Sequence, residues 1–234
     1  MPYRNLLLIP GTLYDAELWR HQIDHLGDVA NLHVGRHSMD DTVDVIAHRL
    51  LDEMPPGHFG MAGLSMGGYL ALAVMRLAPD RVNRLCLLDT SARADTPDQA
   101  QRRADLVALA QKGDFQGRTQ RMLPVFIHPD RLNEEPLRSD VMAMNKRFGL
   151  EAYLRQQSAN ASRIDARPHL GEIRCPTLVI CGRQDILLPP EHSEELTAGI
   201  PGATLVYIED CAHLPTMERP QATTALLRYW LLLD

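Results

Sequence analysis

Residues 63–67 read Gly-Leu-Ser-Met-Gly, a G-x-S-x-G sequence between a short apolar stretch and a helical pattern. A serine at such a strand-to-helix turn has strained backbone torsions and an exposed hydroxyl, and the flanking glycines avoid collisions with the neighbouring strand and helix. The helix that follows points its free N–H groups and its positive end toward any anion formed beside the serine. We therefore predict that Ser65 is a nucleophile.

A serine hydroxyl is a weak nucleophile at neutral pH and needs a general base, usually an imidazole oriented by a carboxylate. Two later segments supply these groups in the chain order serine, acid, histidine. Asp185 follows the expected strand Thr177–Cys181, and His213 follows the expected strand Thr204–Ile208. Ser65 also follows a strand, so all three side chains are expected at the carboxyl edge of one sheet. The sequence therefore predicts a catalytic triad.

The oxyanion of an acyl-transfer reaction needs hydrogen-bond donors of its own. The backbone N–H of Met66, the first residue of the expected helix, is one donor by position. The second is expected from the loop after the first strand, where residues 9–13 read Ile-Pro-Gly-Thr-Leu. Because Gly11 permits a tight turn, we assign this second donor to the N–H of Thr12.

Short apolar runs alternate with helical patterns along most of the chain, and both sets define the expected fold. The expected strands are Asn5–Ile9, Ala30–Val34, His58–Ala62, Arg84–Leu88, Thr177–Cys181 and Thr204–Ile208. The expected helices are Glu17–Leu26, Val43–Met54, Met66–Leu77, His192–Ile200 and Gln221–Leu232. This alternation predicts a doubly wound α/β fold, with a mainly parallel sheet covered by helices on both faces.

One interval, from about Ala92 to His169, has no strand pattern. Its helical stretches are Ala100–Gln111, Phe115–Leu123 and Val141–Ala159, and prolines 124, 129, 136 and 168 punctuate it. We predict that residues 92–168 form a helical cap, inserted after the fourth strand, over the strand ends where ligands bind in open α/β sheets. Residues 1–91 and 169–234 would then form the core.

The apolar residues of the predicted cap have two possible roles. They could line an acyl-binding pocket, or they could pack the cap helices against each other. The sequence leaves both roles open for Met122, Phe126, Met142, Met144, Phe148 and Tyr153.

The charge of the 234-residue chain is formally −6, which argues against nucleic acid as a partner. Its distribution is uneven, because the segment 93–167 holds 13 Arg and Lys against 10 Asp and Glu. Solvated helix faces are the ordinary explanation of such a segment. The sharper hypothesis is a cap that attracts anionic substrates.

The four cysteines form no C-x-x-C motif, and most lie in apolar runs where a buried free thiol is expected. The apolar run at residues 6–9 is too short for a signal-peptide core or a membrane span. We therefore expect a cytoplasmic protein that is not inserted in a membrane.

Three sequence stretches resemble the α/β-hydrolase superfamily. They are Gly-Leu-Ser-Met-Gly-Gly at 63–68, Gly-Arg-Gln-Asp at 182–185 and Ala-His-Leu-Pro at 212–215, the last followed by Glu-Arg-Pro. Within the superfamily the chain is similar to small bacterial carboxylesterases, 3-oxoadipate enol-lactonases and the C–C-bond enzymes of menaquinone synthesis. The resemblance implies that Ser65 is the nucleophile, His213 the base and then the acid, and Asp185 the orienting carboxylate. It also implies that Thr12 and Met66 hold the oxyanion.

Two features depart from this family pattern. The first loop of the family usually reads His-Gly-x-Gly, whereas residues 10–13 read Pro-Gly-Thr-Leu, without the histidine that normally helps to anchor the loop. The sequence also starts almost directly in the strand Asn5–Ile9, which leaves no room for the antiparallel hairpin that often begins the fold. We therefore predict a six-stranded, all-parallel sheet.

Two assignments have competitors. Asp89 ends the strand Arg84–Leu88 and could reach the histidine, as in family members that take the acid from this strand, or it could cap the following turn. We favour Asp185 because its Gly-Arg-Gln-Asp segment matches the commoner pattern. His21 and His25 have the i, i+4 spacing of zinc ligands, but position 22 is Gln and no third ligand is indicated, so no metal is predicted.

Together these features predict a serine hydrolase that needs no cofactor and cleaves a small ester or lactone through an acyl-enzyme on Ser65. The expected partner is the small-molecule substrate, and the chain is expected to be a monomer or homodimer. A C–C bond hydrolase or lyase of the same fold is the first alternative. The second is a hydrolase-like ligand receptor with slow turnover.

Overall fold

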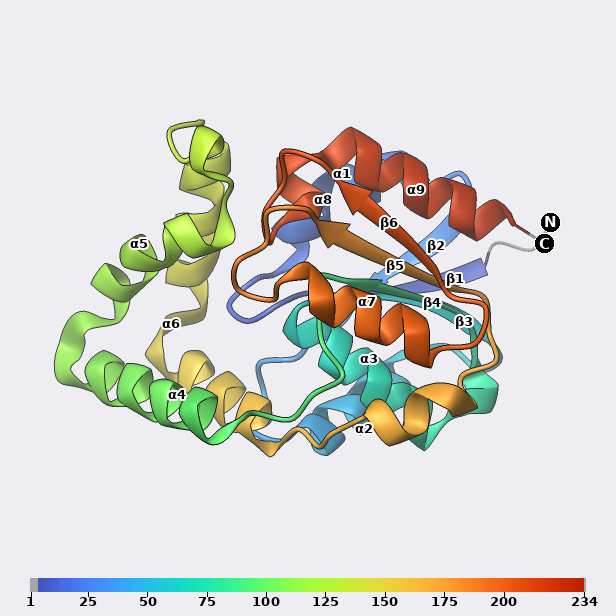
Figure 1. The fold of residues 1–234 in the computed structure, drawn as a ribbon, viewed down its shortest axis with the longest axis horizontal. Coiled ribbons are helices and arrows are strands. Elements are labelled where there is room, and N and C mark those ends of the chain that lie inside the picture. Colours follow the sequence, from blue (N-terminus) through green and yellow to red (C-terminus); the bar gives the residue numbers. More distant parts are fainter. Residues whose placement is uncertain (1–3, 234) are drawn as a thin grey trace.

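The sheet of the protein has six parallel strands in the order β2-β1-β3-β4-β5-β6 (Figure 1). The structure is a computed structural model that describes residues 4–233, apart from the side chains of residues 4, 114 and 116–119. The strands are β1 Arg4–Ile9, β2 Ala30–Val34, β3 Phe59–Leu64, β4 Val82–Leu88, β5 Thr177–Gly182 and β6 Thr204–Ile208. The predicted six-stranded sheet is confirmed, and every strand pairing within residues 4–233 is parallel.

Helices cover both faces of this sheet, as predicted for a doubly wound fold. They are α1 Arg20–Leu26, α2 Val43–Glu53, α3 Met66–Leu77, α7 Pro190–Gly199, α8 Pro215–Glu218 and α9 Pro220–Leu232. In Figure 1, α1, α8 and α9 lie on one face, and α2, α3 and α7 lie on the other. The expected helix Glu17–Leu26 is wrong in its first turn, which is a 3₁₀ helix at Ala16–Trp19 capped by the Asp15 carboxylate.

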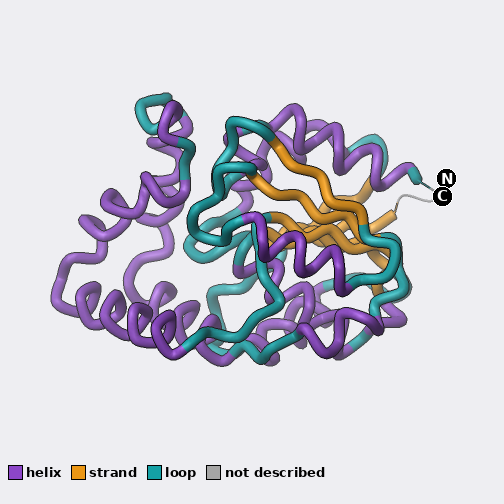
Figure 2. The backbone as a smooth tube through the Cα atoms, viewed as in Figure 1, coloured by secondary structure: helices purple, strands orange, loops and turns teal. Residues whose placement is uncertain are grey.

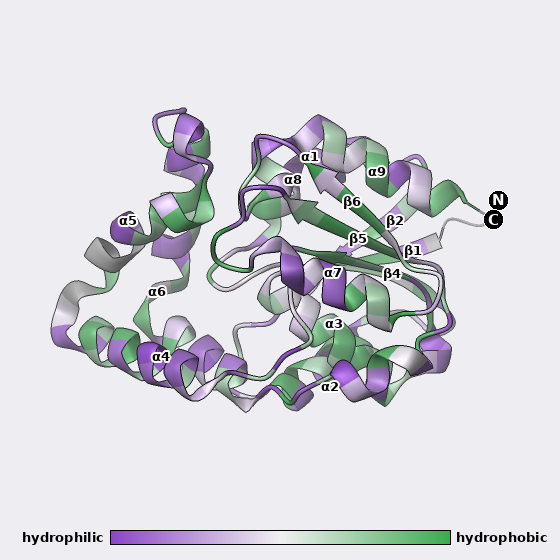
Figure 3. Ribbon diagram, viewed as in Figure 1, coloured by the Kyte–Doolittle hydropathy of each residue, from purple (hydrophilic) through white to green (hydrophobic). Residues whose placement is uncertain are grey.

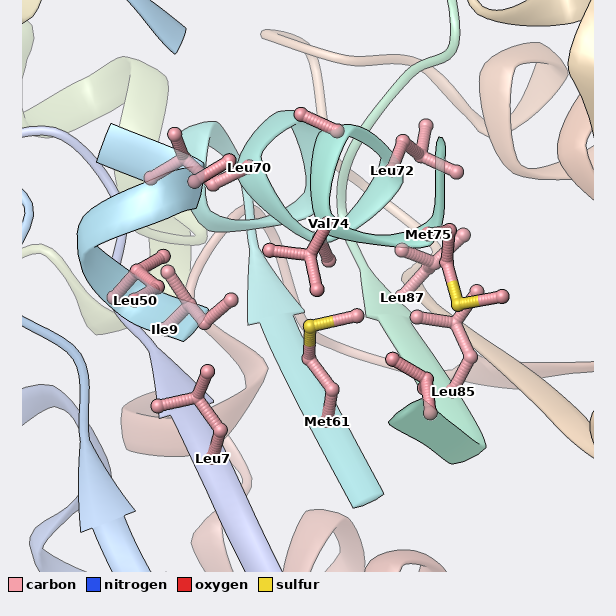
Figure 4. Packing of buried hydrophobic residues seen from close by; sticks show 14 of the residues in the cluster. Leu7, Ile9, Leu50, Met61, Leu70, Leu72, Val74, Met75, Leu85 and Leu87 are labelled. Atoms are coloured by element: carbon pink, nitrogen blue, oxygen red, sulfur yellow. The ribbon is translucent and has the colours of Figure 1, made fainter. Parts of the chain in front are cut away.

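Alternating side chains of the strands fill two apolar cores, one under each helical layer. Leu7 and Ile9 of β1 face α2 and α3, as Figure 4 shows, while Leu6 and Leu8 face α1 and α9. These four side chains are at most 1% exposed. Burial on both faces explains the continuous apolar runs in the sequence. It also holds the strand ends, and the loops that follow them, in fixed positions.

Three α-helices lie between β4 and β5 and, with the segments that join them, form what we call the insertion, residues 97–162. They are α4 Pro97–Leu109, α5 Phe115–Phe126 and α6 Leu137–Ser162. Figures 1 and 2 place them beyond the carboxyl ends of the strands. The expected end of the second helix at Leu123 is wrong, because α5 continues through Pro124 to Phe126. A proline so close to the helix end removes only one late backbone hydrogen bond, and Ile127 N–H still donates to the Leu123 carbonyl at 2.9 Å.

The ribbon of the insertion carries both hydrophilic and hydrophobic residues, whereas that of the sheet is predominantly hydrophobic (Figure 3). It packs on the core through Leu123, Ile127 and Val141, which belong to the apolar cluster on the α1 and α9 face. A separate small cluster joins Tyr153 of α6 to Leu13 of the β1–α1 loop. None of the helices in residues 4–233 combines the length and apolar character needed to cross a bilayer.

Candidate active site

Ser65 lies on a strained turn between the end of β3 and the start of α3. Its φ of 56° and ψ of −117° fall where a non-glycine residue is rarely found. A Cβ on Gly63 would collide with the Gly67 carbonyl, and one on Gly67 would collide with the Ile9 carbonyl. The backbone therefore imposes glycine at both flanking positions of the motif. The turn leaves the Ser65 side chain partly exposed, at the wall of a cavity.

His213 and Asp185 meet at the carboxyl ends of β5 and β6. The Nδ1 atom of His213 lies 2.7 Å from Oδ2 of Asp185, and both side chains are almost fully buried. The other carboxylate oxygen, Oδ1, accepts the N–H groups of Leu187 at 2.8 Å and Leu188 at 3.1 Å. These bonds fix the carboxylate, and the Asp185 contact requires the His213 proton on Nδ1. The opposite ring nitrogen, Nε2, is then the basic one.

Asp89, the competing acid, is fully buried near Asp185 and has a different partner. Its Oδ1 accepts the Gly182 N–H at 2.8 Å, and Oδ2 has no hydrogen-bond partner assigned among the described residues. Burial, followed by the charge of Asp185, raises the pKa of Asp89 well above its usual range. A raised pKa makes Asp89 a poorer source of the negative charge that stabilises an imidazolium. The carboxylate that contacts His213 belongs to Asp185.

The β1–α1 loop carries the predicted second oxyanion donor, Thr12. The Leu13 N–H is already used, since it donates to Oε1 of Gln156 at 2.9 Å. Within residues 4–233 the Thr12 N–H has no acceptor assigned. His37 donates from Nε2 to the Gly11 carbonyl at 2.9 Å, and burial lowers the pKa of His37, which keeps its ring neutral. The N–H groups of Thr12 and Met66 remain the predicted oxyanion donors.

One cavity of about 610 Å³ brings the predicted residues together. It is lined by Ser65, His213, Thr12 and Met66, which come from three segments: the turn between β3 and α3, the loop after β6 and the loop after β1. The predicted acid Asp185 lies behind His213 and does not line it. Of the six apolar residues weighed for an acyl pocket, Met122 and Phe126 line this cavity, whereas Met144 and Tyr153 are buried in helix packing.

The other sequence features have structural explanations. His21 and His25 stack with ring centroids 4.1 Å apart, and His21 contacts the Thr224 hydroxyl at 2.8 Å. Within the described residues no group of three or more His, Cys, Asp or Glu side chains could hold a metal ion. All four cysteines are free thiols.

Sequence reasoning missed the residues that hold the site loops. The buried Glu218 carboxylate accepts the N–H groups of Ala212 at 3.0 Å and Leu214 at 3.1 Å, on either side of His213. It also accepts the His128 N–H from the insertion at 2.7 Å. Burial raises the pKa of Glu218, and these donors oppose that shift. The Glu-Arg-Pro segment after the histidine was the available signal for this residue.

A second set of missed residues comes from α6. In addition to Gln156, the Asn160 side chain donates to the Thr12 hydroxyl at 3.0 Å, and Arg147 forms a two-bond ion pair with Asp15. Nothing in the sequence pairs these positions with the first loop, because they are more than 130 residues apart.

The alpha/beta hydrolase fold model matches residues 5–220, and the chain belongs to this family. Among curated relatives, it is 29% identical over 71% of its length to a pimeloyl-acyl-carrier-protein methyl ester esterase of Neisseria meningitidis. That match covers 66% of the relative, slightly under two thirds. This chain is also similar to a 2-hydroxy-6-oxononadienedioate/2-hydroxy-6-oxononatrienedioate hydrolase of Cupriavidus pinatubonensis. The two are 30% identical over 74% of this chain and 62% of that relative.

Solved structures show the same fold. A thermophilic esterase from Thermogutta terrifontis, with malate bound, is 28% identical and has a TM-score of 0.88, with 97% of this chain and 89% of that chain covered. The enol-lactonase from Burkholderia xenovorans is 24% identical with a TM-score of 0.89, covering 100% and 93%. The predicted resemblance to esterases and enol-lactonase-like hydrolases is confirmed.

Proposed function

We propose that this chain is a serine hydrolase that cleaves a small carboxylic ester or lactone through an acyl-enzyme on Ser65. One observation carries the proposal. Ser65, on its strained turn, lines the same cavity as His213, whose Nδ1 is 2.7 Å from the buried Asp185 carboxylate. Acyl transfer by serine requires a nucleophile next to a base that is itself oriented by an acid.

The reaction proceeds in two halves. His213 takes the Ser65 proton on Nε2 as the Ser65 oxygen attacks the substrate carbonyl carbon, and Asp185 stabilises the imidazolium that forms. The tetrahedral intermediate expels the alkoxide, which leaves as an alcohol with the proton from His213. Water then gives its proton to His213, attacks the acyl-enzyme and releases the carboxylic acid, and Ser65 regains its proton. No cofactor is needed at any step.

The N–H groups of Thr12 and Met66 would bind the oxyanion during both halves. Met66 begins α3, so the positive end of the helix dipole adds to its donor. The insertion, as part of the predicted cap of residues 92–168, would set substrate size and exclude bulk water. Free, mostly buried thiols support a cytoplasmic location, and the chain is proposed to act as a monomer or homodimer.

Replacing the nucleophile tests this proposal. Ser65→Ala should lower kcat for 4-nitrophenyl esters by at least about 10³-fold, because the covalent step is lost. Circular dichroism and thermal unfolding should show an intact fold, since alanine removes one oxygen. Activity near that of wild type in a folded Ser65→Ala variant would overturn the proposal.

The relative from Cupriavidus pinatubonensis, a C–C bond hydrolase by name, favours that activity as the second candidate. A vinylogous 1,5-diketone would then be cleaved in place of an ester. Steady-state assays of such a diketone beside aryl esters and lactones separate these two activities. Turnover of every ester far below once per second, together with ligand-dependent binding of a partner protein, would instead favour the receptor alternative.

A further inference from the structure

A cluster of charged side chains lies in the cavity wall formed by the insertion and its connections to the core. Asp95 accepts two hydrogen bonds from Arg103, at 2.8 and 3.0 Å, and one from Arg163 at 2.6 Å. The Asp95 side chain is 7% exposed, and the guanidinium-bearing side chains are 21% and 8% exposed. The single carboxylate of Asp95 thus pairs with two largely buried guanidinium groups.

The excess of positive charge extends along this wall. Arg102 lines the cavity as well, and the acceptor assigned to its guanidinium within residues 4–233 is the uncharged carbonyl of Asp98, at 3.2 Å. Among the described residues that line the cavity, Arg102, Arg103 and Arg163 therefore stand against the single carboxylate of Asp95. Arg103 and Arg163 are shielded from water, so their charges act at a lower local dielectric constant and add to the positive potential at Arg102.

The cluster is connected to the predicted nucleophile through α3. Tyr69 follows Ser65 by about one helical turn, and both line the cavity. The guanidinium carbon of Arg163 lies 4.4 Å from the centroid of the Tyr69 ring. A ligand that reaches from the Ser65 turn along Tyr69 therefore meets the positively charged wall.

We propose that the wall formed by Arg102, Arg103 and Arg163 binds a carboxylate of the substrate, so that the preferred esters or lactones carry a free carboxylate in addition to the reacting carbonyl. This inference rests on the proposed function for its catalytic part. Arg103 and Arg163 are held in place by Asp95, Gln157 and backbone carbonyls. Arg102 is exposed and makes the direct ion pair with the incoming anion.

Matched substrates test this subsite. The 4-nitrophenyl half-esters of succinate, glutarate and adipate are compared with the same esters in which a carboxamide replaces the free carboxylate. For the best chain length, wild-type kcat/KM should be about tenfold higher for the anionic ester, which is the effect of one favourable charge pair. Arg102→Gln should lower this ratio at least about threefold. Arg138→Gln, which changes an exposed arginine of α6 paired with Glu135, should leave the ratio as in wild type.

Binding separates the subsite from catalysis. Isothermal titration calorimetry of wild type with glutarate and with neutral glutaramide should show binding of the dicarboxylate alone, weakened by Arg102→Gln and by 0.5 M KCl. If no ester is cleaved, the proposed function fails, and calorimetry still decides whether the subsite exists. Equal kcat/KM for charged and neutral esters, or equal binding of glutarate and glutaramide, would show that the cluster only joins α4 to α6 and would overturn the inference.

Discussion

The turn that carries Ser65 and the loop that carries Thr12 lie at the same edge of the sheet but are held in different ways. The Ser65 turn is held by core backbone, because Gly67 packs on the Ile9 carbonyl and the Ser65 N–H donates to the Leu88 carbonyl at 3.0 Å. The Thr12 loop is held largely by side chains of the insertion, namely Asn145, Arg147, Gln156 and Asn160.

This difference shows that the insertion is built into the candidate site. It bonds to the histidine loop as well, since the His213 N–H donates to the Phe126 carbonyl at 3.1 Å and the His128 N–H donates to Glu218. Changes to the core groups that form the nucleophile, orient its base or hold its turn should therefore abolish the chemistry or destabilise the fold. Changes in the insertion should weaken catalysis by degrees, and the variants below test this contrast.

The largest effect is expected from Asp185→Asn in the core. The amide cannot stabilise the imidazolium and can hold His213 in the wrong tautomer, so kcat should fall by about 10⁴-fold. Ester hydrolysis by the purified variant measures this fall. Asp165→Asn is the control, because Asp165 pairs with Arg167 at the surface, away from the cavity. A tenfold effect or less at position 185 would mean that another group orients the histidine.

The next largest effect is expected from Gly67→Ala, which tests the backbone of the Ser65 turn. Its Cβ would overlap the Ile9 carbonyl, so the free energy of unfolding should fall by about 3 kcal/mol or more. Urea unfolding of wild type and Gly67→Ala measures this change in the free energy of unfolding. In Gly27→Ala the new Cβ meets nothing within 4 Å and the backbone is helical, so this control should be neutral or stabilising by up to about 1 kcal/mol. Equal stability of the two variants would contradict the proposed role of the motif glycines.

A smaller effect is expected from Gln156→Leu in the insertion. Removing its carbonyl leaves the buried Leu13 N–H without an acceptor, a change that typically costs about 1–3 kcal/mol. The neighbouring Thr12 N–H would then be misplaced, and kcat should fall about 10- to 100-fold while KM changes little. Gln156→Glu keeps an acceptor oxygen and should restore much of kcat. A parallel loss in both variants would show that Gln156 serves only to pack the helix.

The smallest effect on activity is expected from Asp89→Asn. Asparagine keeps an acceptor for the Gly182 N–H and tolerates the φ of 40° at this position, so kcat should stay close to that of wild type. Because the pKa of Asp89 is raised in the folded protein, wild type loses stability as the pH rises above about 4, the usual aspartate pKa. Asp89→Asn has no ionisable group at this position, so its stability lacks this decrease with pH.

Urea unfolding of both proteins between pH 5 and pH 8 checks this sign. The stability of Asp89→Asn relative to wild type should increase with pH over this interval. A difference in unfolding free energy that stays constant with pH would mean that Asp89 is ionised in the folded protein. A large fall in kcat of Asp89→Asn would mean that Asp89 takes part in catalysis.

The placement of Ser65, Asp185 and His213 after their strands could be predicted from the sequence because its determinants are local, and their catalytic roles stay predictions. Ser65 is announced by glycines two residues away, and Asp185 and His213 each follow an apolar strand directly. The supports of the Thr12 loop could not be predicted in this way. Gln156 and His37 look like ordinary helix and loop residues, and their contacts with Leu13 and Gly11 depend on how distant elements pack. Pro10 stands where the family usually has the histidine that helps to anchor this loop, and this departure does not identify the residues that hold the loop here.

A covalent bond to the Ser65 oxygen is the central step of the proposed mechanism, and mass spectrometry can observe that bond directly. Wild type is treated with a fluorophosphonate, and separately quenched during turnover of a slow ester, before peptide mapping. We predict one phosphonyl or acyl group per chain, on the peptide that contains Ser65, and none in Ser65→Ala or in unfolded wild type. Modification of a different residue, or ester turnover with Ser65 unmodified under both treatments, would contradict the acyl-enzyme mechanism.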